Sequence, residues 1–384
     1  MLVRPSWRLG SLAGIEIAVH PSWLIIFALF AYAATIGAHM IADALGFSLS
    51  VANGVALGLI ASAALFASVV IHEFAHALVA RRLGIPTGNI TLFLFGGVAS
   101  ILREPGTPAD EVKMAAAGPA ASVALSVAFA VLALVARSAG WNWLLTLCVF
   151  LAVANVLLAA FNLLPAFPSD GGRILRAALW RFMGSQARAT AAASAVSAAV
   201  AAALIVLGGY EAVVRRLAHD PQWWTSGWLV LIALFLLQSA MASGRQARIN
   251  LALERMRVGD CMSSSLVPVA NDTSLAAFLA LVPSDGKRVG YPVVENGEFV
   301  GLVNPRDTGS VPPVLWPDTP VTAIMTPARK MQAFSPDAPA SDAMGALATS
   351  DARSLPVFDH GQLTGVVSRE TIFGALRDQG VIGR

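Results

Sequence analysis

Two histidines and one glutamate lie together in the segment His72-Glu73-Phe74-Ala75-His76. On a helix, residues four apart share one face, so the two imidazoles can bind one metal ion with Glu73 beside it. Zinc suits such a site, because catalytic zinc takes three protein ligands and keeps a fourth position for water. A neighbouring glutamate can accept the proton of that water and pass it to a leaving amine. The segment therefore predicts a site for one Zn²⁺ per chain, with Glu73 as general base.

Two residues further along the chain are candidates to complete this site. Asp170 lies in the segment Asn162-Leu-Leu-Pro-Ala-Phe-Pro-Ser-Asp-Gly-Gly-Arg173, whose prolines and glycines break a helix where a carboxylate could be aimed at an ion. We expect Asp170 to be the third metal ligand; alternatively, it is the N-cap of a helix that starts at Gly171. Asn162 could hydrogen-bond the substrate backbone or a developing oxyanion, or it could be a buried structural amide.

Membrane spans must hold most of these residues. The chain of 384 residues is 56% hydrophobic and 13% charged, whereas soluble domains contain about 25% charged residues. About 20 apolar residues are needed to cross a bilayer as a helix. Six segments meet this length: 21–41, 52–80, 110–136, 142–164, 189–209 and 223–243. His72, Glu73 and His76 lie inside the second span, where a charged group costs about 2 kcal/mol or more and therefore needs an internal role.

The positive charges indicate the orientation of these spans. If the N-terminus is cytoplasmic, twelve Lys or Arg residues flank the spans on the inner side and three on the outer side. An even number of spans then places the C-terminus in the cytoplasm too, and brings Asp170 to the same side as the histidines. No segment reads as a cleaved signal peptide. We expect a multi-pass protein of a bacterial or archaeal cytoplasmic membrane.

The segment between the second and third spans, residues 88–102, is too short and too rich in glycine to cross the bilayer. Its alternation and β-branched content predict a β-hairpin. A hairpin at membrane depth is tolerated only where protein or a water-filled cavity covers it. The alternative is an ordinary cytoplasmic loop.

The charge density rises after Gly244, which predicts a transmembrane domain over residues 1–244 followed by a linker over 245–255 and a soluble region. Three short motifs of this region recur after 63 or 64 residues, so it contains a duplication, with repeats over 256–312 and 313–384. Each repeat is predicted as strand, helix, strand, strand, helix. The soluble region holds 13 basic and 14 acidic residues, which argues against nucleic-acid binding, and the chain's two cysteines predict no disulfide framework.

The membrane part resembles the site-2 protease family. The resemblance rests on the segment that starts at His72, on the segment from Asn162 to Arg173 and on Ala117-Gly118-Pro119 at the start of the third span, and it covers roughly residues 8–210. It implies intramembrane zinc proteolysis of single-pass membrane proteins, as in regulated intramembrane proteolysis. It also implies that His72, His76 and Asp170 are the ligands, that Glu73 is the base, that Asn162 handles substrate, and that the Gly96-Gly97 hairpin lines the substrate cleft.

The repeats are similar to a tandem pair of cystathionine-β-synthase (CBS) domains, a family that commonly binds adenine nucleotides such as ATP or AMP and often dimerises. The family's nucleotide motif is a glycine followed by a hydroxyl residue and an aspartate. The first repeat has Asn304 and Asp307, so it keeps the carboxylate but lacks the hydroxyl. The second has Ser368 but Thr371 in place of the carboxylate. Nucleotide sensing, homodimerisation and substrate docking therefore all stay open for this module.

Two other functions fit parts of the pattern. A transporter or channel with a regulatory CBS pair would use His72, Glu73 and His76 as a permeation site. Transporters tend to contain internal repeats in their membrane part, and residues 1–244 have no such repeat. A catalytically silent scaffold would present substrates to another protease, but it would have no need of Glu73. We therefore expect a polytopic α-helical membrane protease with a membrane-associated β-hairpin and a cytoplasmic α/β tandem CBS module.

Overall fold

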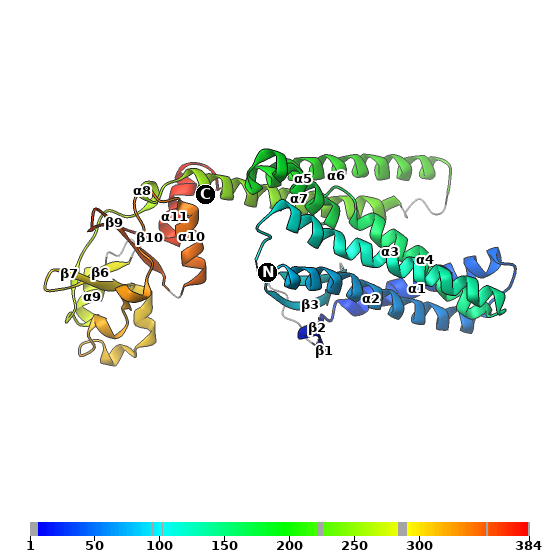
Figure 1. Ribbon diagram of the computed structural model, residues 1–384, viewed down its shortest axis with the longest axis horizontal. Helices are drawn as coiled ribbons and strands as arrows, with labels where there is room; N and C mark the ends of the chain where they lie inside the picture. The colour runs from blue at the N-terminus through cyan, green and yellow to red at the C-terminus, as the bar shows by residue number, and fades with distance from the viewer. Residues whose placement is uncertain are drawn as a thin grey trace. The chain divides into compact units, whose positions relative to one another are not determined.

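The computed structural model of the protein describes residues 7–93, 96–101, 103–220, 226–282, 290–350 and 352–382. It divides into two compact units, Met1–Gly244 and Arg245–Arg384 (Figure 1).

Six helices in the described part of the chain are long and apolar enough to cross a membrane. They are α1 (Trp23–Ala44), α2 (Val51–Arg82), α3 (Pro108–Ser138), α4 (Asn142–Asn162), α6 (Gln186–Leu217) and α7 (Ser226–Arg255). Large apolar side chains such as Leu134 and Val206 point outward, 69% and 71% exposed, as expected of surfaces that face lipid. The polytopic helical fold predicted from composition is confirmed.

Local sequence signals start several of these helices. Ser50, Thr107 and Ser185 are N-caps of α2, α3 and α6, and each side-chain oxygen accepts a hydrogen bond from the backbone amide three residues later. Helix α1 packs against α2, α2 against α3, and α3 against α4 (Figure 1). The second of these contacts places α3 beside α2, the helix that carries the histidines.

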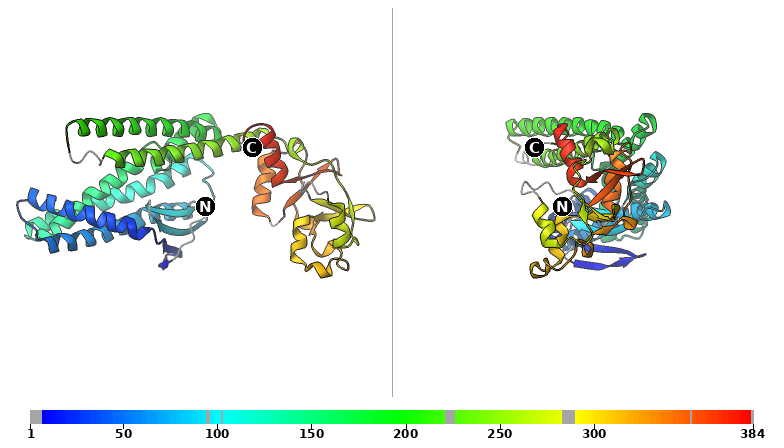
Figure 2. Two further views of the ribbon diagram at one scale, coloured as in Figure 1. Left: turned by 180° about the vertical axis from the view of Figure 1, so that it is seen from behind. Right: turned by 90° about the vertical axis from the view of Figure 1, so that its left-hand side faces the viewer.

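A four-stranded sheet with the order β1-β2-β3-β4 lies at the end of α2 (Figure 2). Its strands are β1 (Trp7–Leu12), β2 (Ile15–Val19), β3 (Thr87–Phe93) and β4 (Gly96–Ile101). Strands β3 and β4 pair antiparallel, which confirms the predicted hairpin, although residues 94, 95 and 102 lie outside the described residues. The β1–β2 hairpin was not predicted; it adds to the sheet through parallel pairing of β2 with β3.

The chain turns sharply between α4 and the short helix α5 (Asp170–Met183). A β-carbon on Gly171 would overlap the carbonyl oxygens of Leu163 and Leu164, and one on Gly172 would lie 2.7 Å from the amide nitrogen of Phe167. Only glycine permits this close approach of two backbones. The Gly-Gly pair therefore allows α5 to start directly against the end of α4, with Asp170 as its first residue.

The second unit contains both repeats. Its four-stranded sheet has the order β5-β6-β7-β8 and is followed by the β9–β10 hairpin. The strands are β5 (Val269–Ala270), β6 (Tyr291–Glu295), β7 (Glu298–Val303), β8 (Thr326–Pro327), β9 (Ser354–Asp359) and β10 (Gln362–Ser368), and the helices are α8 (Val258–Cys261), α9 (Leu275–Leu281), α10 (Ala340–Thr349) and α11 (Arg369–Asp378). Where the first repeat was predicted to end in a helix, it has a 3₁₀ turn at Pro305–Ser310. The CBS-type α/β architecture predicted for this region is present.

The leading segment of each repeat pairs with the other repeat. Strand β8, which precedes the second repeat's helices, pairs with β7 of the first repeat. In the opposite direction, Ser263 pairs with Val366 in β10. Residues 245–255, predicted as a linker, form the last turns of α7, and Leu253 lies in the second unit's core with Met256 and Cys261.

Candidate functional site

His72 and His76 lie one turn apart on α2 and are almost fully buried, with 3% and 5% of their surface exposed. Their Nε2 atoms are 3.2 Å apart, and the Oδ2 atom of Asp170 lies 3.2 Å from the first and 3.1 Å from the second. A tetrahedral zinc ion with bonds of about 2.0–2.1 Å separates its ligand atoms by about 3.3 Å. The three side chains therefore have the donor types and the spacing of one zinc site.

The space that faces these ligand atoms is kept free by a glycine. A β-carbon on Gly118 of α3 would overlap the Nε2 atoms of both His72 and His76. A helix interior otherwise favours alanine over glycine by about 1 kcal/mol. Glycine is needed here because any side chain would displace an ion bound by the two imidazoles. The space that Gly118 leaves beside the two Nε2 atoms therefore fits the metal that the ligand set indicates.

Helix α3 also orients the two imidazoles. The Nδ1 atom of His76 donates a hydrogen bond to the carbonyl of Met114 at 2.7 Å, and Nδ1 of His72 lies 2.9 Å from the hydroxyl oxygen of Ser122, which is fully buried. With Nδ1 hydrogen-bonded to the protein, each neutral ring presents Nε2 to the ligand cluster. Sequence reasoning missed Met114 and Ser122. Their spacing of four residues on either side of Gly118 placed all three on one helical face, which was the available signal.

Asp170 is the first residue of α5, and Ser169 before it is the N-cap, so the proposed alternative of Asp170 as an N-cap is wrong. The Ser169 hydroxyl donates to the carbonyls of Leu164 and Ala166, which fixes the turn that precedes the carboxylate. Burial raises the pKa of the Asp170 carboxyl, but hydrogen bonds to His72 and His76, together with electrostatic attraction to these two rings, hold the pKa below its usual value. The carboxyl is thus anionic at neutral pH, the form that a cation requires.

Glu73 is half-buried and lies beside the hairpin. A β-carbon on Gly97 in β4 would be 2.8 Å from Cγ of Glu73, so the strand backbone passes directly over this side chain. Gly96 is the first residue of β4 and pairs with Phe93. The structure therefore brings Gly97 of the hairpin next to the predicted base.

Asn162, the last residue of α4, is half-buried, and its amide nitrogen donates to the carbonyl of Leu158 at 2.9 Å. This bond ties the amide to its own helix. The role of Asn162 toward substrate stays a prediction.

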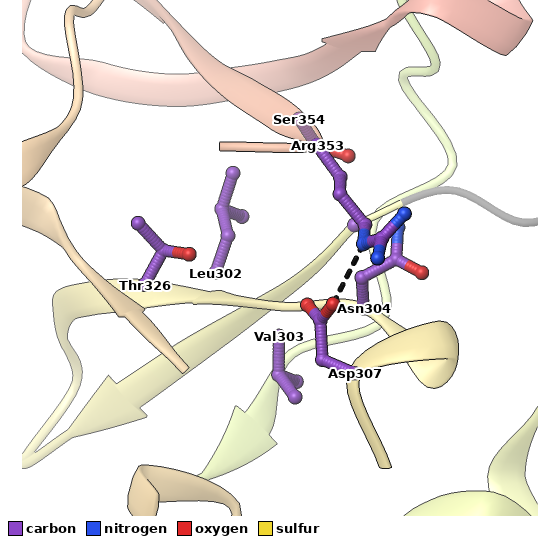
Figure 3. A pocket seen from close by; sticks show the side chains of 8 residues that line it. Leu302, Val303, Asn304, Asp307, Thr326, Arg353 and Ser354 are labelled. Carbon is purple, nitrogen blue, oxygen red and sulfur yellow. Dashed lines mark hydrogen bonds and ion pairs between the residues drawn. The ribbon is translucent and has the colours of Figure 1, made fainter. Parts of the chain in front are cut away.

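In the second unit, Asn304 and Asp307 line one small cavity together with Arg353 and Ser354 of the other repeat (Figure 3). This partly open cavity has a volume of ≈ 10 Å³, about the room that one water molecule needs. Arg353 Nε donates to Oδ1 of Asp307 at 2.7 Å, and Figure 3 shows the two side chains pointing at each other. Ser368 is not among the residues that line this cavity; it is fully buried, and its hydroxyl caps α11.

Comparison with known proteins identifies both units. The family "Peptidase family M50" matches residues 60–139 and 134–207, and the family "CBS domain" matches residues 258–307 and 321–378. The chain is 32% identical over 369 residues to the "Putative zinc metalloprotease Rip3" of Mycobacterium tuberculosis, which covers 95% of this chain and 91% of that protein. It is 29% identical over 327 residues to the "Zinc metalloprotease MJ0392" of Methanocaldococcus jannaschii, covering 81% of this chain and 83% of the relative.

Among solved structures, the site-2 protease from Methanocaldococcus jannaschii aligns with 62% of this chain and 94% of its own, with 30% identity and a TM-score of 0.39. The two relatives match 95% and 81% of this chain and are named as metalloproteases, which sets aside the transporter and channel hypothesis. This chain belongs to peptidase family M50: it is a site-2 protease-like zinc metalloprotease that spans the membrane several times and carries a tandem pair of CBS domains.

Proposed function

We propose that the protein is an endopeptidase that cleaves single-pass membrane proteins within the bilayer, with His72, His76 and Asp170 as the zinc ligands. One observation carries this proposal: three ligand atoms from α2 and α5 lie 3.1–3.2 Å apart, buried, at the end of a membrane-spanning helix. A catalytic site inside a span selects for substrates that are themselves in the bilayer.

Zinc, when bound by these three residues, supplies a Lewis acid that polarises a peptide carbonyl and acidifies water. Glu73 follows His72 directly on α2 and acts as the general base. Its carboxylate takes the proton of the attacking water and then donates that proton to the amine of the departing peptide. Asn162 is proposed to hydrogen-bond the substrate near the scissile bond.

A substrate helix must become extended before its backbone can be attacked. Strand β4 is at the edge of the four-stranded sheet, and its Gly97 lies against Glu73. An extended substrate segment can pair with such an edge by strand addition, in which backbone hydrogen bonds supply the affinity. Gly96 and Gly97 would then bring the substrate backbone close to the base.

The proposed orientation has both termini in the cytoplasm of a bacterial or archaeal cell. It is supported by the excess of Arg and Lys flanking the spans on one side. With this orientation, water reaches the ligands from the cytoplasmic side. In this orientation Gly46 and His219 both lie on the outer side of the membrane. The variants Gly46→Cys and His219→Cys test it: both introduced cysteines must be labelled by a membrane-impermeant reagent added outside the cell.

The decisive test is cleavage of a tagged single-pass substrate by the purified full chain. Wild type is expected to cleave and Glu73→Gln to lose at least about 10²-fold in rate, because general acid–base catalysis contributes about 10²–10⁴-fold. The matched control is Glu211→Gln, an isosteric change in α6 on a half-exposed side chain. Equal activity of wild type and Glu73→Gln would refute the assignment of the base.

We further propose that the CBS pair binds an adenine nucleotide at the cavity that contains Asn304 and Asp307. Binding requires that Asp307 be released from Arg353 and that the ≈ 10 Å³ space open. Calorimetric titration of the full chain with ATP and AMP should detect binding, and Asp307→Asn should weaken it about tenfold or more, because a hydrogen bond to a charged group contributes about 1.5–3 kcal/mol. Asp318→Asn, at an exposed position, is the control.

Equal affinity of Asp307→Asn and wild type would contradict this nucleotide site.

We also propose that the CBS pair makes the protein a homodimer. Light scattering of the full chain in detergent, corrected for the micelle, should give twice the mass of 40.0 kDa. A monomer mass would contradict the dimer.

A further inference from the structure

A buried ion pair joins α3 to α5 outside the ligand set. Glu111 is fully buried on α3, and Arg176 is 9% exposed on α5. The Nε atom of Arg176 donates to Oε1 of Glu111 at 2.7 Å, and its Nη2 atom donates to the same oxygen. Arg173 Nε lies 4.0 Å from that oxygen as well. Buried charges are costly, and removal of one partner costs about 3–5 kcal/mol, so such a pair calls for a purpose beyond stability.

The position of Glu111 on α3 relates it to the ligands. Glu111, Met114, Gly118 and Ser122 are spaced by three, four and four residues, so they lie on one face of the helix. Met114 and Ser122 contact the two histidines, and Gly118 leaves room at both Nε2 atoms. The first residue of this face contacts the helix that carries the remaining ligand. One face of α3 thus contacts both histidine ligands directly and, through Glu111, contacts helix α5, which carries Asp170.

Helix α5 connects the ion pair to Asp170. Asp170, Arg173 and Arg176 follow one another at intervals of three residues, so Arg173 neighbours both Asp170 and Arg176 on the surface of α5. With a rise of about 1.5 Å per residue, Arg176 is about 9 Å along the helix from Asp170. A short helix that is held at its second turn by Glu111, and at its start by contact with α4, has little freedom to slide or rotate.

We propose that Glu111 and Arg176 are positioning residues that hold Asp170 at the metal site by locking α5 against α3. The inference rests on the proposed role of Asp170 as the third zinc ligand. Residues that orient metal ligands typically change metal affinity about 10–100-fold when mutated. Because the pair acts through Asp170, its contribution should vanish when Asp170 is absent.

A double-mutant cycle on zinc affinity tests this coupling. The zinc dissociation constants of wild type, Glu111→Gln, Asp170→Ala and the double variant are measured by competition with chelators of graded strength in the detergent-solubilised full chain. Glu111→Gln is expected to weaken zinc binding about 10–100-fold in the wild-type background and less than about threefold in the Asp170→Ala background. Equal losses in both backgrounds, or no loss in the first, would overturn the proposal.

Two further variants separate positioning from folding. Arg176→Lys keeps the charge but removes the second donor, and it serves as the partner in the same cycle if Glu111→Gln does not fold. Arg181→Gln, at an exposed position on the same helix, should leave zinc affinity unchanged. In cleavage assays, the positioning variants should lower kcat with little change in KM, since substrate contacts are untouched. If Asp170→Ala alone leaves zinc affinity unchanged, the ligand assignment fails, and that outcome is distinct from a failed cycle.

Discussion

Replacement of Gly118 by alanine is the sharpest single test of the metal centre. The added methyl group would overlap the Nε2 atoms of His72 and His76, closer than any real β-carbon contact. Either the imidazoles or helix α3 must move by about 1 Å to relieve this overlap, and a shift of that size at a reacting site costs about 10²-fold in rate. In free energy this is about 2.7 kcal/mol of transition-state stabilisation. Zinc affinity should fall by a similar factor, because the displaced nitrogens are the proposed ligand atoms.

The assay pairs zinc competition with cleavage kinetics on the same preparations. Gly209→Ala is the matched control, because Gly209 also lies in a membrane-spanning helix and a β-carbon there meets nothing within 4 Å. Alanine stabilises a helix relative to glycine by up to about 1 kcal/mol. If Gly118→Ala loses function and Gly209→Ala does not, a weakened helix is therefore not the cause. If zinc affinity and kcat/KM of Gly118→Ala stay within about twofold of wild type, Gly118 is not required to keep space for the ion.

Three other predictions address the bound metal, the orientation of the His72 ring and the burial of Cys261 in the second unit. Removal of zinc by a chelator should abolish cleavage and lower the midpoint of thermal unfolding. Zinc at 100 times its Kd should restore about 2.7 kcal/mol of unfolding free energy; an unchanged midpoint would contradict a zinc site that exists only in the folded state. Ser122→Ala should weaken zinc binding about tenfold by releasing the His72 ring, whereas Ser138→Ala at the exposed end of α3 should not; equal affinities would contradict the orienting role. Burial raises the pKa of the Cys261 thiol to about 11, so iodoacetamide at pH 7.5 should label it only after unfolding, as judged by mass spectrometry; rapid labelling of the folded chain would contradict this burial.

The parts of the site predicted from sequence were those set by short-range geometry. Residues four apart on a helix must share a face, so the pairing of His72 with His76 needed no tertiary information. Asp170 was found because prolines and glycines around it marked a break in a span. The contacts of Met114 and Ser122 depend on how α3 is rotated against α2, and packing of apolar helices leaves that rotation unreadable in a single sequence.

Two elements were missed for different reasons. The β1–β2 hairpin did carry a signal: alternation in Ile15-Glu16-Ile17 follows the turn residues Ala13 and Gly14, both of which have positive φ. In the first repeat, the segment predicted as a helix begins with Pro305 and contains Gly309, and it closes as a 3₁₀ turn. Proline suits the first turn of a helix, but glycine favours its early end.

The exchange of leading segments between the repeats has a consequence for biosynthesis. Strand β7 is complete as a sheet member only after β8 has been made, and the core around Leu253 and Cys261 is closed by residues as distant as Leu376. At about 5–20 residues per second, the ribosome needs roughly 6–25 s to pass from Leu253 to Leu376. During this interval the apolar side chains near the end of α7 have no native partners from the second repeat. We therefore expect residues 245–384 to complete their native core only after the second repeat has been synthesised.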